Sequence, residues 1–68
     1  MVADWVRVYR SEEEYQAVLI RELLENYDLH PVLMDRKDDE FRIGYAEVYV
    51  APEESERARQ IIEENQKP

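Results

Sequence analysis

The chain has 68 residues with no cysteine, and 17 acidic residues against 9 Lys and Arg give it a net charge of −8. This length allows one domain. The absence of cysteine excludes disulfides, Cys-ligated metals and thiol catalysis. The excess of acidic residues disfavours nucleic acid and anionic membranes as partners. Because 44% of the residues are apolar, including one Trp and five Tyr, we expect residues 1–68 to fold as a single domain, with frayed ends at 1–4 and 65–68.

The first predicted strand covers residues 5–9. Its valines alternate with larger side chains at the period of two that is typical of a strand. Val6 and Val8 are expected on one face, and Trp5, Arg7 and Tyr9 on the other.

A helix is predicted next, over residues 12–27. Ser11 and Glu14 have the spacing of a capping box, which would mark its start. The apolar residues follow the i, i+3, i+4, i+7 spacing of one buried helix face: Ile20, Leu23, Leu24 and Tyr27.

Two further strands follow the break at His30-Pro31, where the residue before proline avoids the helical region. Residues 31–35 predict the second strand, residues 36–40 a charged connector, and residues 41–50 the third strand. Gly44, the only glycine, is expected to mark a bulge or a turn.

The last predicted element is a helix that begins within residues 51–54. Pro52 suits its first turn, where no backbone N–H is needed. Its buried stripe would contain Ala58, Ile61 and Ile62.

The element order β-α-β-β-α predicts an α+β domain. Two helices on one face of a three-stranded antiparallel sheet of order 1-3-2 would bury both apolar stripes, as in a ferredoxin-like split βαβ fold that lacks its final strand. The predicted core comprises Val6, Val8, Ile20, Leu23, Leu24, Val32, Met34, Ala46, Val48, Val50, Ala58, Ile61 and Ile62.

This arrangement leaves one sheet face and the edge of the first strand uncovered. The uncovered face is expected to hold a candidate interface of six residues: Trp5, Arg7, Tyr9, Tyr45, Glu47 and Tyr49. These side chains either bind a partner or a second copy, or they are ordinary outward-facing strand residues. Unpaired strand edges also invite pairing with another chain.

Four segments resemble one small bacterial family. Residues 5–11 are similar to its opening W-x-x-V-Y-x-S/A pattern, and residues 17–25 to its A-x-L-I-x-x-L-L-E helix. Residues 31–35 resemble its second strand, and residues 47–62 its ending. The family is a domain of unknown function described as prokaryotic signal-transducing proteins.

The resemblance covers about residues 5–62, and it implies a fold related to that of the nitrogen-regulatory PII proteins. PII proteins bind nucleotide and 2-oxoglutarate through long loops and basic residues. This chain has neither feature, so the resemblance carries over the fold and not that ligand chemistry. The charged stretch 36–40 and the single glycine depart from the family pattern.

No pattern in the sequence predicts a catalytic residue, a cofactor or a metal site. His30 has no partner His in the sequence, so a structural role is favoured over catalysis. The acidic residues within 35–40 do not have the spacing of an EF-hand and are expected to form a solvated turn. No glycine-rich loop is present to bind phosphate.

Two functions remain open. The first is a cytoplasmic, non-catalytic regulatory module that binds a protein partner or forms a homodimer. No apolar run exceeds four residues, so neither a membrane span nor a signal-peptide core is expected. The alternative is a sensor of small metabolites or anions bound near the loop of residues 36–43, where Arg36, Lys37 and Arg42 supply cations.

Overall fold

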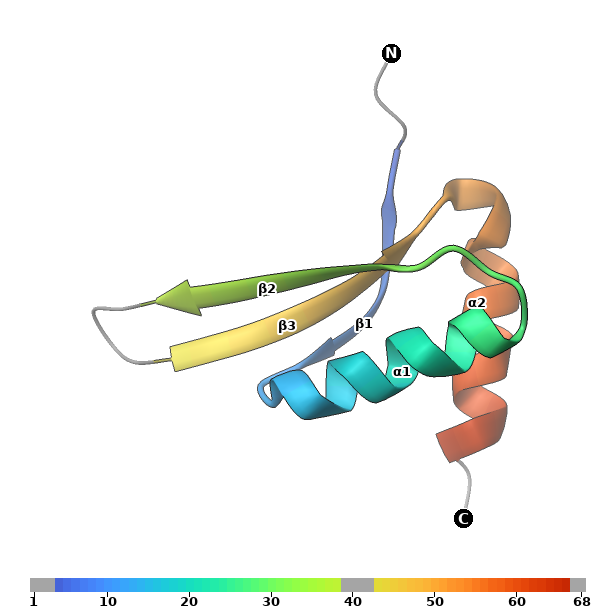
Figure 1. Cartoon of the computed structure of the whole chain (residues 1–68). Coiled ribbons are helices and arrows are strands. Elements are labelled where there is room, and N and C mark those ends of the chain that lie inside the picture. Colours follow the sequence, from blue (N-terminus) through green and yellow to red (C-terminus); the bar gives the residue numbers. More distant parts are fainter. Residues whose placement is uncertain (1–3, 39–42, 67–68) are drawn as a thin grey trace.

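A computed structural model of the chain describes residues 4–38 and 43–66. Its elements, in chain order, are β1 (Val6–Ser11), α1 (Glu14–Asn26), β2 (Val32–Asp38), β3 (Ile43–Val50) and α2 (Pro52–Gln66). The strands form one antiparallel sheet of order β1-β3-β2, and the two helices pack against each other and the sheet (Figure 1). The predicted α+β arrangement and strand order are confirmed. Within the described residues, no helix is long and apolar enough to cross a membrane.

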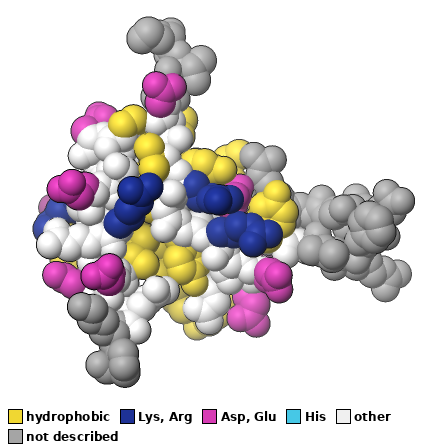
Figure 2. Space-filling view, turned by 180° about the vertical axis from the view of Figure 1, so that it is seen from behind, with side chains coloured by type: hydrophobic (Ala, Val, Ile, Leu, Met, Phe, Trp, Pro, Cys, Tyr) yellow, Lys and Arg dark blue, Asp and Glu magenta, His cyan; other side chains and the backbone are white. Residues whose placement is uncertain are grey.

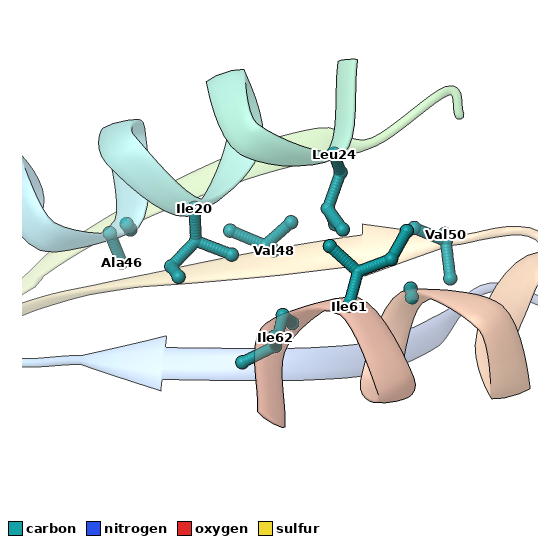
Figure 3. Packing of buried hydrophobic residues seen from close by; sticks show 9 residues of the cluster. Ile20, Leu24, Ala46, Val48, Val50, Ile61 and Ile62 are labelled. Carbon is teal, nitrogen blue, oxygen red and sulfur yellow. The ribbon is translucent and has the colours of Figure 1, made fainter. Parts of the chain in front are cut away.

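The hydrophobic core lies between β3 and the two helices (Figure 3). Because side chains of a strand alternate between faces, three alternate residues of β3 all point toward the helices. The buried hydrophobic residues are Ala17, Ile20, Leu24, Ala46, Val48, Val50, Ala58, Ile61 and Ile62. All of them except Ala17 were in the predicted core.

The side chains of β2 have the opposite orientation to the predicted one. Leu33 pairs with buried Val48 and packs against the core, whereas Val32 and Met34 are 38% and 39% exposed. The core assignment of Val32 and Met34 was therefore wrong. Three apolar residues stand in a row here, so the alternation did not show which of them faces the helices.

A β-bulge in β1 changes the orientation of its second half. Arg7 pairs with Tyr49, but the next pair is Tyr9 with Val48, so Val8 is the extra residue of the bulge. Tyr9 consequently packs against the core from the helix-covered side, together with Val8. The prediction that Tyr9 lies on the uncovered face was wrong.

Helix α1 begins at Glu14, two residues later than predicted. Ser11 is the last residue of β1, and its Oγ accepts a hydrogen bond from the backbone N–H of Glu13 at 3.0 Å. Glu13 is the N-cap residue and makes no side-chain capping bond. The Ser11–Glu14 capping box was therefore not confirmed.

Helix α1 ends in a Schellman motif. The backbone N–H of Leu29 donates to the Leu24 carbonyl at 3.1 Å, and the N–H of Asp28 donates to the Glu25 carbonyl at 3.0 Å. Asp28 has a φ of 66°, the left-handed conformation that aspartate tolerates better than most residues. Leu29 also packs on the core that contains Leu24, which fixes the exit of the chain from the helix.

β2 and α2 extend further than predicted, whereas β3 lies within the predicted residues 41–50. β2 continues to Asp38, through part of the expected charged connector, while residues 39–42 lie outside the described residues. Gly44 pairs with Lys37 in regular register and has no positive φ, so the expected bulge or turn there was wrong. α2 runs to Gln66, two residues into the segment that was expected to fray, and residues 1–3 and 67–68 lie outside the described part.

Candidate binding site on the open sheet face

The sheet face turned away from the helices, which we call the open face, carries the candidate site. Residues paired directly across antiparallel strands share a face, and the register places Arg7 and Val32 on either side of Tyr49, and Arg10 and Met34 on either side of Glu47. The described open-face side chains are Trp5, Arg7, Arg10, Val32, Met34, Tyr45, Glu47 and Tyr49.

One end of the open face is hollowed into an apolar groove. Its volume is about 340 Å³, and Trp5, Val32, Met34 and Tyr49 line it. Trp5 precedes β1, Val32 and Met34 come from β2, and Tyr49 comes from β3, so all three strands position the groove. Trp5 is 47% exposed, which leaves a large aromatic surface in contact with water.

A buried carboxylate lies beside the groove. Glu47 is only 4% exposed although it points away from the helices. Its Oε2 accepts a hydrogen bond from Arg7 Nη1 at 2.7 Å, and its Oε1 accepts one from the Tyr49 hydroxyl at 3.0 Å. The carboxylate of Glu47, through its hydrogen bond and its charge, raises the pKa of the Arg7 guanidinium. A buried charge is tolerated only when it is paired and hydrogen-bonded, so this network orients Arg7 and Tyr49.

A cation–π contact covers the other tyrosine of the open face. The guanidinium carbon of Arg10 lies 4.5 Å from the centre of the Tyr45 ring. Such a contact is favourable because the ring face is electron-rich. One face of Tyr45 is thus occupied by Arg10, and Trp5 and Tyr49 are the aromatic side chains that line the groove.

The distribution of charge over the molecule is uneven. Seen from behind in Figure 2, basic side chains lie mainly around the middle of the molecule beside hydrophobic ones, although some also lie at the left outline, and acidic side chains lie mostly nearer the outline. α1 contains three glutamates and α2 contains five. Much of the acidic charge therefore belongs to the helices.

The structure brings together five of the six residues of the predicted interface: Trp5, Arg7, Tyr45, Glu47 and Tyr49. The bulge removes Tyr9 from this set and places Arg10 on the open face instead. Sequence reasoning missed Arg10, Val32 and Met34. Strand alternation would have found Val32 and Met34 together, but nothing in the sequence marks the bulge.

The alternative ligand site at residues 36–43 stays a prediction. Arg36 and Lys37 pair in the backbone register with Tyr45 and Gly44. Their side chains, and the whole of Arg42, lie outside the described residues. In the part of the chain that is described, no group of three or more His, Asp or Glu side chains is arranged to hold a metal ion.

His30 forms a contact that involves none of the open-face side chains. Its Nδ1 lies 2.9 Å from Glu54 Oε2, and its backbone N–H donates to Glu54 Oε1 at 3.0 Å. One carboxylate of the first turn of α2 thereby holds the loop between α1 and β2. The hydrogen bond and the charge of Glu54 raise the pKa of His30, and the two hydrogen bonds from His30 lower the pKa of Glu54.

This pair predicts a pH dependence of stability. The His30 contribution is complete below pH 6.5, the ordinary pKa of histidine, and is lost as the pH rises through the raised pKa of the folded state. The Glu54 contribution is complete above pH 4.5 and is lost as the pH falls through the lowered pKa. We therefore expect the difference in melting temperature between the wild type and His30→Gln to be largest between pH 4.5 and 6.5 and to shrink by pH 8.5.

The measurement is thermal unfolding of both proteins across this pH range. An NMR titration of the imidazole should give a midpoint above 6.5, and it is unambiguous because the sequence has one histidine. A melting difference that does not change with pH, or an imidazole midpoint at or below 6.5, would contradict the ion pair.

Comparison with known proteins gives one match. The model of the family described as "Putative prokaryotic signal transducing protein" matches residues 5–66. No curated protein and no solved structure matches the chain.

Proposed function

Because the chain belongs to this family of prokaryotic signal transducing proteins, we propose that it is a non-catalytic interaction module whose open face binds a protein partner. In this role the sheet is a rigid platform, the helices support it from behind, and signalling depends on whether the partner is bound. Bacterial cytoplasm is the proposed location.

The observation that carries this proposal is the set of exposed apolar side chains around the groove. Trp5, Val32 and Met34 are each more than a third exposed although they adjoin one another. Adjoining apolar side chains in contact with water mark interaction sites, and Trp and Tyr are frequent at the centres of interfaces. Tyr49 supplies the second aromatic wall.

The open-face network supports a binding role over a catalytic one. Both Glu47 oxygens accept hydrogen bonds from neighbouring side chains, and Glu47 does not line the groove. A general acid or base must reach a proton of its substrate, whereas this carboxylate holds Arg7 and Tyr49 in place.

The experiment is site-specific cross-linking in bacterial cells. A photoreactive phenylalanine analogue in place of Met34, which lines the groove, should form cross-linked protein species. The same analogue in place of Leu19, on α1, is the control, because Leu19 and Met34 are 41% and 39% exposed. Trp5→Ala should reduce the cross-linking from position 34 severalfold.

Two results would count against the proposed function. One is equal cross-linking from positions 19 and 34, and the other is cross-linking at position 34 that Trp5→Ala leaves unchanged. The mass of the cross-linked species separates a second copy from another protein. Light scattering on a sizing column, over a series of concentrations, tests independently for a homodimer through the open face or the β1 edge.

A further inference from the structure

The open face differs in charge from the whole chain, which carries −8. Among its described side chains, Arg7 and Arg10 are cationic and exposed, whereas Glu47 is only 4% exposed. A partner that docks here therefore meets two guanidinium groups and almost no exposed negative charge on these side chains.

Arg7 is oriented for recognition of a further anion. Its side chain is 53% exposed, and one of its nitrogens, Nη1, is held by Glu47 at 2.7 Å. A guanidinium has five N–H donors in a fixed plane, so donors remain for a second carboxylate. Arg10 is held by a different contact, the stacking of its guanidinium on the Tyr45 ring. Less side-chain freedom is lost on binding when a cation is already held in place.

The groove next to these cations suits one apolar side chain. Its volume of about 340 Å³ is at the small end of the range for ligand pockets, which is about 300–1,000 Å³. Trp5 and Tyr49 form rigid aromatic walls, and Met34 can adapt its shape to the guest.

Resting on the proposed function, we infer that the open face binds an acidic, extended segment of a partner protein. One apolar or aromatic side chain of that segment occupies the groove, and its flanking carboxylates pair with Arg7 and Arg10. Binding depends on both the arginines and the groove. A peptide without carboxylates, or an acidic peptide without the apolar side chain that fills the groove, should therefore bind less tightly than a segment that has both.

The charge distribution favours this partner over a second copy of the chain. In a symmetric dimer the same surface meets itself, so the two exposed arginines of one copy would meet a face that also carries exposed Arg7 and Arg10 and almost no exposed carboxylate. The glutamates of α1 and α2 lie on the other side of the sheet. Salt screens charges beyond about 8 Å at physiological ionic strength, so nearby Arg7 and Arg10 act more strongly on a docked segment than distant glutamates do.

A single-stranded nucleic acid fits the open face less well. Sheet-face readers of RNA stack bases on exposed aromatic rings, whereas one face of Tyr45 is covered by Arg10 and the Tyr49 hydroxyl is bonded to Glu47.

The test uses NMR chemical-shift mapping with three capped eight-residue peptides and an oligouridylate. The first peptide has acidic residues around a central Leu-Phe pair. In the second, lysines replace the acidic residues, and in the third, serines replace Leu-Phe. The first peptide should shift the signals of the open face, including the Trp5 indole, and should bind at least tenfold more tightly than the other two.

Matched variants locate the contacts. Arg10→Glu and Trp5→Ala should each weaken binding of the first peptide at least tenfold. Arg59→Glu, an exposed position on α2, is the control for charge, and Tyr15→Ala, 69% exposed on α1, is the control for loss of an aromatic ring. Both controls should leave the dissociation constant unchanged within twofold.

The outcomes separate this inference from the proposed function. If the lysine peptide or the oligouridylate binds the open face as tightly, or Arg59→Glu weakens binding as much as Arg10→Glu, the acidic-segment inference is wrong while the face remains a binding surface. If millimolar concentrations of the first peptide shift no open-face signal, the inference is also wrong. Failure of position 34 to form cross-links in a chain that carries no other substitution, or cross-linking there no stronger than at position 19, would instead overturn the proposed function itself.

Discussion

Leu24→Ala is expected to lower the free energy of unfolding by about 2–5 kcal/mol, the range for truncation of a fully buried leucine. Leu24 is 0% exposed and packs between the two helices and β3 (Figure 3). Its carbonyl also accepts the bond that ends α1. Since folded proteins are stable by about 0.05–0.15 kcal/mol per residue, this loss is a large share of the total for 68 residues.

Urea denaturation followed by circular dichroism measures this change. Leu19→Ala is the matched control, because Leu19 lies on the same helix but is 41% exposed, and it should change the free energy by no more than about 0.5 kcal/mol. Should Leu24→Ala fail to fold, Leu24→Met keeps the volume and should cost less than about 1.5 kcal/mol. Equal effects at positions 19 and 24 would show that α1 does not bury this face.

Glu47→Lys is expected to destabilise the fold by about 3–5 kcal/mol, the cost of leaving a buried charge without its partner. The position is 4% exposed in the central strand, and the new ammonium group would lie beside Arg7. Glu64→Lys makes the same charge change at an exposed position of α2 and should cost less than about 0.5 kcal/mol. Urea denaturation of both variants at the same pH is the measurement.

A charge swap tests whether the pairing itself is responsible. The double variant Arg7→Glu with Glu47→Lys restores opposite charges at the two positions and should recover part of the stability that Glu47→Lys loses. Tyr49→Phe removes one hydrogen bond to Glu47 and should cost about 1–3 kcal/mol. If the swap recovers nothing, burial of the lysine, and not the loss of the ion pair, dominates the effect.

The candidate site was predictable only where the alternation of side chains was unambiguous. In β3 the sequence alternates strictly, so Tyr45, Glu47 and Tyr49 were assigned correctly to the open face. In β2 three apolar residues, Val32, Leu33 and Met34, follow one another. Either orientation of the strand would therefore have turned apolar side chains toward the helices. The burial of Glu47 was not predictable either, because it depends on side chains from the neighbouring strands.

The sequence by itself determined the element order, the strand order and most of the core of this protein. Periodicity and turn residues are local signals, and one three-stranded arrangement buries the stripes of both helices. Only the tertiary structure decided which residues form the open face. The β1 bulge turns Tyr9 inward and Arg10 outward, and the groove needs residues from β2, from β3 and from the segment before β1. Both depend on how the strands pair across the sheet.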